Sequence, residues 1–424
     1  MLKRLFKSKL LGNTAIYALA NVLNGAIPFL LLPILTRVFT PEEYGLVTLV
    51  SAVIAIMGAF TGLSAHGAVS VKYFDQTVNH PQFVGASLLV LAGSTTFILF
   101  FLLLTGDAIS SWINLPKQWL FIAAIASAAQ FVINIRLTMW QVQHQAYRYG
   151  FFQVAQTVFN LAISLVLVLG LLIGWTGRVW AIVFATFLFA FISLVTLKKE
   201  GLVNWLRNKD YTREVLAFGM PLIPHTLGGM AIAMSDRFVV SKILGTDAVG
   251  ILTIATQVST FLGFFIDGFI KAYSPQFFKI LSNISDNDKK NLVRSTYAFY
   301  IGLFLVSSIY IYSAQLFIPY LVGESFRTAI TYIPWLVYST AFMGAYYSVG
   351  LYIVYAAKTH LLSSITAIIG VMHFFLMYYA VNEQGLLGAA KVSLLSSMLM
   401  FLLTWILSAR VFPMNWIHVL SGKS

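Results

Sequence analysis

Amide and hydroxyl side chains recur at helical spacing inside a long apolar segment near residues 11–36. The polar residues step by four, four and three positions, at Asn13, Tyr17, Asn21 and Asn24. Such steps place all of them on one face of a helix. A polar face is costly in hydrocarbon and turns toward the inside of a helix bundle or a water-filled cavity. The stripe can therefore hydrogen-bond to neighbouring helices or to a hydroxyl-rich solute.

Two further apolar segments carry stripes of the same kind. The segment near 250–272 contains Thr253, Gln257, Thr260, Asp267 and Lys271 on one face. The segment near 119–141 contains Gln130, Asn134, Thr138 and Gln141. Any single residue of this kind is explained by a hydrogen bond between helices, worth about 0.6 kcal/mol. Three stripes together favour a polar central cavity.

Two acid–base pairs lie within apolar segments and are the sharpest candidates for chemistry. Asp236 and Arg237 are adjacent, deep in the segment near 215–243. Asp267 and Lys271 are four residues apart, so that they can pair across one helical turn. For Arg237, a salt bridge to a neighbouring helix and a contact with an anionic substrate are equally good interpretations.

Other polar residues in the apolar segments fit structural roles. Arg136 points away from the stripe of its own segment, and Lys391 lies near the end of another, so snorkelling or a helix–helix contact is favoured for both. His66, His225 and His373 have no carboxylate beside them in sequence, which favours core contacts over proton relay. The sequence contains no Cys, no zinc-protease motif and no Gly-rich phosphate loop, so it predicts neither a metal, a cofactor nor an enzyme.

The elements that must position these side chains are transmembrane helices. Hydrophobic residues make up 59% of the 424 residues and charged residues only 10%, against about 25% charged in typical soluble chains. One span needs about 20 apolar residues. Apolar segments of that kind fall near 11–36, 46–70, 84–105, 119–141, 151–173, 179–197, 215–243, 250–272, 294–316, 331–356, 361–381 and 386–408. The sequence predicts an all-α integral membrane protein of about twelve transmembrane helices.

The distribution of basic residues predicts the orientation. With a cytoplasmic N-terminus, 19 of the 27 Lys and Arg residues fall on the cytoplasmic side, 4 on the other side and 4 within spans. Such a positive-inside bias places both termini in the cytoplasm. The net charge of +13 then reflects topology and contact with anionic lipid headgroups, and no nucleic-acid partner is expected.

The chain is expected to form two six-helix halves, 1–197 and 214–424, joined by a basic cytoplasmic linker at 198–213. An offset of 205 residues aligns the two halves. The polar or glycine pairs at this offset are Thr36/Ser241, Arg37/Lys242, Glu42/Asp247, Gly45/Gly250 and Thr48/Thr253. Because both halves enter the membrane from the same side, the repeat is parallel, with a pseudo-twofold axis along the membrane normal.

Two stretches resemble a known family. They are NTAIYALANVLNGAIPFLLLPILTRVFTPEEYG (13–45), with its T-R-x-x-x-x-E-x-[YF]-G ending, and SDRFVVSKILGTDAVGILTIATQV (235–258), with its D-R…L-G-x-x-x-V-G pattern. The chain resembles the O-antigen and lipid-linked oligosaccharide flippases of the multidrug/oligosaccharidyl-lipid/polysaccharide transporter superfamily. The resemblance implies a protein of the bacterial inner membrane, with two halves around a cationic cavity. It would move an undecaprenyl-pyrophosphate-linked O-antigen or similar polysaccharide repeat unit across the membrane by alternating access.

This resemblance suggests roles for the polar residues. Arg237 and Lys271 would bind the pyrophosphate, with Lys72 at the cytoplasmic mouth of the cavity. The expected sugar contacts are Asn21, Asn24, Asn134 and Gln257. Structural or coupling charges are Asp236, Asp267, Arg136 and Lys391. Membrane lipids and other polysaccharide-assembly membrane proteins are the further partners expected. Related flippases often carry arginines in the first helix, whereas this chain has none there before Arg37.

Two other functions compete with the flippase interpretation. A multidrug or toxic-compound cation antiporter of the same superfamily shares the architecture but would need an acidic cavity, whereas the intramembrane acids here lie beside bases. An O-antigen polymerase or ligase would carry a large extracytoplasmic loop, and the longest such loops expected here span only 106–118 and 317–330.

Overall fold

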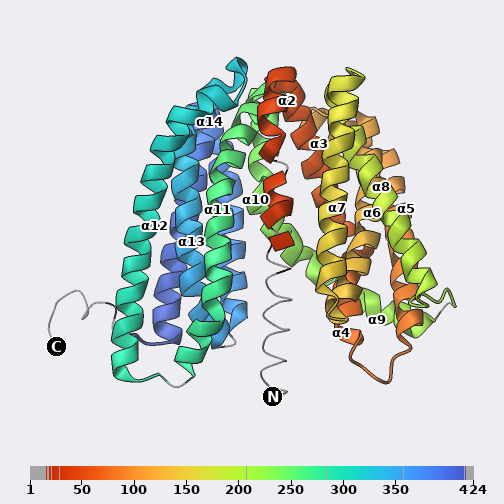
Figure 1. The fold of residues 1–424 in the computed structure, drawn as a ribbon. Coiled ribbons are helices and arrows are strands. Elements are labelled where there is room, and N and C mark those ends of the chain that lie inside the picture. The colour runs from red at the N-terminus through yellow and green to blue at the C-terminus, as the bar shows by residue number, and fades with distance from the viewer. Residues whose placement is uncertain are drawn as a thin grey trace. The chain divides into compact units, whose positions relative to one another are not determined.

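Helices account for all the regular structure in the described part of the chain (Figure 1). The computed structural model describes residues 16, 19–20, 22–27, 29–206, 208–282, 284–356, 358–414 and 416. It leaves out the side chains of residues 222, 224–225, 228–229, 231–232, 271–272, 275 and 359–360. Asn13, Tyr17 and Asn21 of the first predicted stripe, and the side chains of His225 and Lys271, therefore lie outside the described residues.

The chain divides into two units. The first comprises Met1–Met230 and Gly245–Gly250, and the second comprises Ala231–Leu244 and Ile251–Ser424. The sequence predicted a boundary at 198–213 instead. The helix that follows this linker, α9 (Lys209–Gly219), packs on α4 (Ala65–Lys72) and α5 (His80–Ile113) of the first unit.

In the first unit, α6 (Lys117–Val142) is the central helix. It packs against α3 (Pro41–Phe60), α5 and α8 (Trp175–Lys199). Small side chains allow this close approach, and Ala123, Ala124 and Ala126 of α6 are almost fully buried. The remaining elements of the unit are α2 (Leu32–Val38), α7 (Ala146–Leu165) and a π-helical turn at Val166–Gly170.

In the second unit, a pair of helices forms the largest packing contact. These are α13 (Ile333–Tyr355) and α14 (Thr359–Val411), with α12 (Asp286–Leu321) packed on α13. The unit also contains α10 (Leu222–Leu244) from Ala231 onward, α11 (Thr246–Leu281) after Gly250, and a 3-10 segment at Glu324–Thr331. At one end an aromatic cluster includes Phe277, Tyr352 and Trp416, and the Tyr297 hydroxyl donates to the Trp416 carbonyl at 3.0 Å.

Backbone with positive φ interrupts the helices near Gly62 and at Gly385. The helix expected over 46–70 is interrupted because Gly62, Leu63 and Ser64 all have positive φ, so that α3 ends and α4 begins there. A Cβ on Gly62 would collide with the Phe131 ring, and its amide donates to the Ser94 hydroxyl at 2.9 Å. The helices expected at 361–381 and 386–408 both lie within α14, and the non-helical backbone of Gly385 (φ 60°) separates them.

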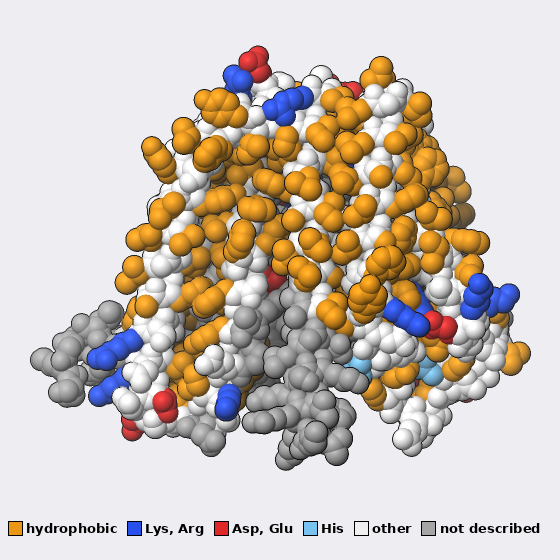
Figure 2. Space-filling model, in the orientation of Figure 1, with side chains coloured by type: hydrophobic (Ala, Val, Ile, Leu, Met, Phe, Trp, Pro, Cys, Tyr) orange, Lys and Arg blue, Asp and Glu red, His pale blue; other side chains and the backbone are white. Residues whose placement is uncertain are grey.

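The surfaces of both units are apolar along the helices. In each unit, hydrophobic side chains cover the sides of the helices and charged ones gather toward the ends (Figure 2). Leu104 is 71% exposed in the first unit and Phe375 is 67% exposed in the second. Eight helices of the described part are long and apolar enough to cross a membrane. The chain is therefore a multi-pass membrane protein, while the number of twelve spans and the cytoplasmic termini remain predictions.

The start of α3 lies within the T-R-x-x-x-x-E-x-[YF]-G stretch and is fixed by residues at positions that the motif leaves open. Thr40 and Glu43 form a capping box, in which the Thr40 hydroxyl accepts from the Glu43 amide at 3.2 Å and the Glu43 carboxylate accepts from the Thr40 amide at 3.0 Å. Pro41 occupies the first turn, where its missing amide is harmless. Thr40, Pro41 and Glu43 thus fix where this helix begins.

The final glycine of the motif lies against the glycine that the repeat pairs with it. A Cβ on Gly45 would collide with the Thr246 carbonyl, and a Cβ on Gly250 would collide with the Pro41 carbonyl. Pro41 and Thr246 are also 205 residues apart. The contact is therefore reciprocal at the offset found in the sequence, and all four residues belong to the first unit.

Substituting Gly45→Ala is expected to destabilise the protein by about 1–3 kcal/mol, because the new methyl group meets a backbone carbonyl that cannot rotate away. Thermal unfolding of the protein in detergent, followed by loss of the monodisperse fraction, measures the effect. Gly58→Ala is the matched control, since Gly58 lies on the same helix with no atom near its Cβ position. Equal melting temperatures for the two variants would contradict the role of this contact.

Candidate functional site

Uncharged polar side chains of the first unit form separate hydrogen-bonded groups along α7, which together are called the polar network. The Thr157 hydroxyl of α7 donates to the Asn24 carboxamide at 2.6 Å, joining the helical segment 22–27 to α7. One residue earlier, the Gln156 amide donates to the Gln130 carboxamide at 3.3 Å. The Gln130 amide in turn donates to Asn134 at 3.1 Å within α6. All these groups are half-buried, so they are within reach of a polar ligand as well as of each other.

The structure thus brings together Asn24 and Asn134, two of the sugar contacts expected from the sequence. Both belong to stripes predicted from spacing, on the segment 11–36 and on α6. They are linked by α7, whose stripe sequence reasoning missed. On α7, Gln153, Gln156, Asn160 and Ser164 step by three, four and four positions. The signal for a fourth stripe was therefore present in the sequence.

The last two residues of the α7 stripe, Asn160 and Ser164, hydrogen-bond with Arg178. Arg178, in the first turn of α8, donates from one Nη to the Asn160 carboxamide and to the Ser164 hydroxyl, the latter at 2.6 Å. The sequence placed Arg178 only as one of the few basic residues outside. Tyr44, at the start of α3, is close enough to act on it electrostatically. The network therefore ends at the part of the unit where α3 and α8 begin.

Arg136 lies away from this network in a contact between helices. Its side chain is fully buried, and it donates to Glu200 at 2.7 Å at the end of α8. The guanidinium also stacks over Trp140, 4.1 Å from the ring centroid. Arg148 of α7 shares the same carboxylate at 3.4 Å. One acid thereby joins α6, α7 and α8.

Removing that acid with Glu200→Gln is expected to lower the free energy of unfolding by roughly 3 kcal/mol. This is the low end of the range for breaking a buried pair, because Glu200 itself is partly exposed. Arg148→Gln is the control: its side chain is 59% exposed, and its loss is expected to cost less than about 1 kcal/mol. Thermal unfolding distinguishes the two, and a Glu200→Gln variant as stable as the parent would refute the role of this pair.

In the second unit, the pair Asp236 and Arg237 is engaged within α10. The Arg237 guanidinium donates to the Asp236 carboxylate at 3.2 Å and to the Ala233 carbonyl at 2.6 Å. Its side chain remains 20% exposed. Arg237 is therefore a partly neutralised cation with room for a further partner.

Sequence reasoning also missed the surroundings of His373. The buried ring lies 2.8 Å from the Ser396 hydroxyl, between the two arms of α14. Asp236 is close enough to act electrostatically on His373, although no carboxylate adjoins it in sequence. The second imidazole nitrogen is buried and has no partner within the described part of the chain.

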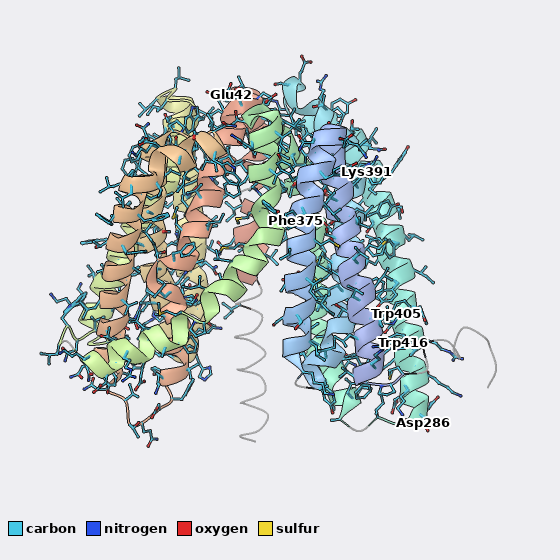
Figure 3. The ribbon with its side chains drawn as sticks, turned by 180° about the vertical axis from the view of Figure 1, so that it is seen from behind. Glu42, Asp286, Phe375, Lys391, Trp405 and Trp416 are labelled. Carbon is cyan, nitrogen blue, oxygen red and sulfur yellow. The ribbon has the colours of Figure 1, made fainter. Side chains whose placement is uncertain are left out.

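The remaining predicted residues have individual settings. In α11, Gln257 and Asp267 each take part in further interactions, and Asp267 is exposed. The Lys391 ammonium donates to Gln384 at 2.8 Å and lies 5.5 Å from the Trp335 ring centroid. Within the second unit, Lys391 lies toward one end and Asp286 and Trp416 toward the other (Figure 3).

Lys72, expected at the cytoplasmic mouth, is held by two acids. It pairs with Glu214 of α9 at 3.0 Å and with Asp75 at 3.4 Å. The hydrogen bond with Glu214 raises the pKa of Lys72, while the hydrogen bond from the Thr77 hydroxyl lowers the pKa of Asp75. Lys72 is thus charged but compensated.

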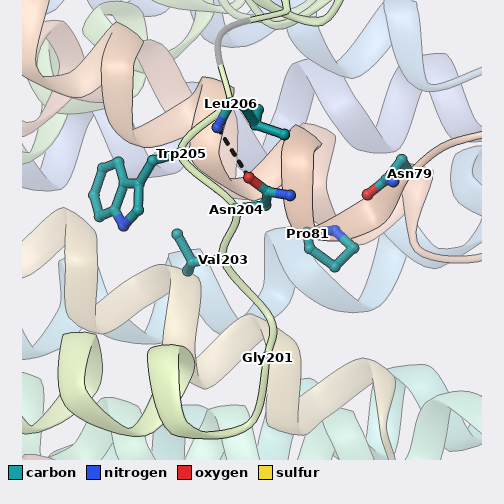
Figure 4. A pocket seen from close by; sticks show the side chains of 7 residues that line it. All are labelled: Asn79, Pro81, Gly201, Val203, Asn204, Trp205 and Leu206. Carbon is teal, nitrogen blue, oxygen red and sulfur yellow. Dashed lines mark hydrogen bonds between the residues drawn. The ribbon is translucent and has the colours of Figure 1, made fainter.

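A surface pocket of about 600 Å³ lies beside the segment between α8 and α9. The segment is folded on itself by a hydrogen bond from the Leu206 amide to the Asn204 side chain at 2.9 Å (Figure 4). The Asn204 amide also donates to the Pro81 carbonyl. The lining is about as polar as it is apolar, and none of its residues belongs to the polar network described above.

Comparison with known proteins identifies the family. The model of the family described as polysaccharide biosynthesis protein matches residues 10–281. The chain belongs to this family. Among curated relatives of this polysaccharide biosynthesis protein is Lsg locus putative protein 1 of Haemophilus influenzae, 26% identical over 306 residues, which are 71% of this chain and 73% of the relative.

Solved structures show which fold this family member has. A multidrug resistance MATE family transporter of the MOP superfamily, in an inward-facing conformation, superposes with a TM-score of 0.73 at 13% identity and covers 96% of both chains. The lipid II flippase MurJ, in an inward closed conformation, gives a TM-score of 0.66 at 13% identity and covers 99% of this chain and 93% of its own. The chain therefore has the fold of this superfamily of transporters.

Proposed function

We propose that this polysaccharide biosynthesis protein is a flippase. It moves an undecaprenyl-pyrophosphate-linked oligosaccharide, an O-antigen or similar surface-polysaccharide repeat unit, across the bacterial inner membrane by alternating access. Both termini face the cytoplasm in this proposal. Support comes from the family, whose description names polysaccharide biosynthesis, and from the fold shared with a lipid II flippase.

The observation that carries the proposal is the polar network of the first unit. Asn24, Gln130, Asn134, Gln156 and Thr157 form two hydrogen-bonded groups of amides and a hydroxyl, which meet at neighbouring positions of α7 inside an otherwise apolar bundle. A sugar offers many hydroxyls that both donate and accept, and amide side chains match them in both roles. An apolar drug-like cation offers few groups that could hydrogen-bond with these side chains.

The balance of charge favours a flippase over a cation antiporter. The hydrogen bonds of this network, within the described residues, involve no acid and end at the cation Arg178. In the second unit Asp236 is already paired with Arg237. A pyrophosphate needs cations that can offer charge-assisted hydrogen bonds, as Arg237 and Lys271 would in this proposal. Lys72 would act at the cytoplasmic mouth, and Asn21 and Gln257 would join the sugar contacts.

Deletion of the gene in its own bacterium tests the proposal. We expect the strain to lose its surface glycan and to accumulate the lipid-linked oligosaccharide at the cytoplasmic face, because assembly continues while export stops. Mass spectrometry of extracted lipid-linked glycans measures the accumulation. The purified protein should also move that glycolipid across the bilayer of a proteoliposome. A deletion strain with normal glycan and raised drug sensitivity would establish the antiporter instead.

Arg237→Gln is expected to reduce glycolipid transport at least about 10-fold, because one charge-assisted hydrogen bond to the pyrophosphate is worth roughly 1.5–3 kcal/mol. Transport in proteoliposomes with equal protein content measures this. Arg327→Gln is the control, since Arg327 forms an exposed pair with Glu324 and has no proposed role in binding. Full transport by the Arg237 variant would remove this residue from the site while leaving the flippase proposal intact.

A further inference from the structure

Among the described residues, the groups that hydrogen-bond with Arg178 are neutral. Its two hydrogen bonds go to Asn160 and Ser164, one helical turn apart on α7. No ion pair formed within the described part of the chain includes Arg178. Tyr44, the titratable neighbour, carries a phenol that is neutral at pH 7. The positive charge is therefore oriented by its neighbours but not compensated by them.

Three other intramembrane or boundary cations of the described residues behave differently. Arg136 has Glu200, Arg237 has Asp236, and Lys117 has Asp107 at 2.7 Å. Glu43 lies near Gly174, before α8, yet its carboxylate accepts from the Thr40 amide at the start of α3. Arg178 therefore forms no ion pair among the described residues, and the Glu43 carboxylate is used at the start of α3.

The position in the helix increases the cost of this arrangement. The N-terminal turn of a helix carries a partial positive charge, so a cation in the first turn of α8 is repelled by the helix it belongs to. Ser164 beside it is fully buried, so water does not surround the group on that side. Burial of a charge without a partner costs several kcal/mol. A bound anion removes both penalties at once.

The geometry fits a phosphate group. Asn160 and Ser164 fix one Nη of the guanidinium, which leaves the rest of the planar fork to bind two oxygens of one oxyanion. The side chain is only partly buried, so a ligand can reach it. Asn160 lies one helical turn after Gln156 on the same stripe of α7. The amides proposed to bind sugar therefore lie next to the cation along this helix.

We propose that Arg178, positioned by Asn160 and Ser164, binds the pyrophosphate of the lipid-linked substrate at the end of the polar network where α3 and α8 begin. The inference rests on the proposed flippase function and extends it with a second phosphate site. Lys72 is the last residue of α4, at the opposite end of the first unit, so the two cations mark opposite ends of the substrate's path. By the predicted topology, Arg178 marks the extracytoplasmic end and binds the substrate before release.

The test uses the full chain in lipid nanodiscs, with native mass spectrometry of bound undecaprenyl pyrophosphate and, in a second arm, of bound phosphatidylglycerol. Arg178→Gln removes the charge. Asn160→Asp keeps the arginine but supplies the counter-ion that the site lacks. We expect both variants to bind undecaprenyl pyrophosphate about 10-fold more weakly than the parent, with Asn160→Asp at least as thermally stable as the parent. Arg327→Gln should bind within about two-fold of the parent.

Each alternative outcome is decisive. If Arg178→Gln and Asn160→Asp bind undecaprenyl pyrophosphate as the parent does, and the parent transports glycolipid, this site is overturned while the flippase proposal stands. If the parent neither binds undecaprenyl pyrophosphate nor transports glycolipid, both proposals fail. If the loss is confined to phosphatidylglycerol, Arg178 binds a bulk lipid headgroup and the assignment to the carrier is overturned.

Discussion

The cost of placing a polar group in hydrocarbon governs this structure. Water is absent from the bilayer core, so every amide, hydroxyl and charge there must find a partner within the protein or in a ligand. Serine and threonine hydroxyls meet this demand locally by donating to the carbonyl one turn earlier, as Ser193 does to Phe189 at 2.7 Å. Amides such as Gln130 and Gln156 reach across to another helix instead. The polar network of the first unit is the result.

The same rule separates the charged residues by role. The charge of Arg136 is compensated by a carboxylate and an aromatic face, and through Glu200 it joins three helices. Arg237 satisfies the rule only in part, with an acid next to it on the same helix and one side still accessible. Among the described residues, the hydrogen-bond partners of Arg178 are neutral, and they orient a charge without neutralising it. The degree of compensation therefore ranks these cations as candidates for an anionic substrate, with Arg178 ahead of Arg237 and Arg136 last.

Much of this was predictable from the sequence, because it depends on local periodicity. Hydropathy predicted the membrane-spanning helices, and spacing placed Asn24 and Asn134 on polar faces. Gly45 and Gly250, which the sequence alone aligned at a fixed offset, lie in contact with each other. The α7 stripe follows the same rule and was overlooked among its aliphatic neighbours. The turn at Gly62, Leu63 and Ser64 has no such signal, because leucine and serine seldom adopt positive φ and the surrounding packing holds them there.

The sequence by itself determined that this protein lies in a membrane, where its helices are, and which face of each helix is polar. These properties follow from the character and spacing of neighbouring residues along one chain segment. Tertiary structure alone decided which polar faces meet, which cation receives a carboxylate and which does not. Arg136 and Glu200 are 64 residues apart, and Arg178 forms no ion pair among the described residues. Neither fact is encoded in local spacing. Compensation of charge is a property of the packed helices, because only packing brings distant side chains within hydrogen-bond reach.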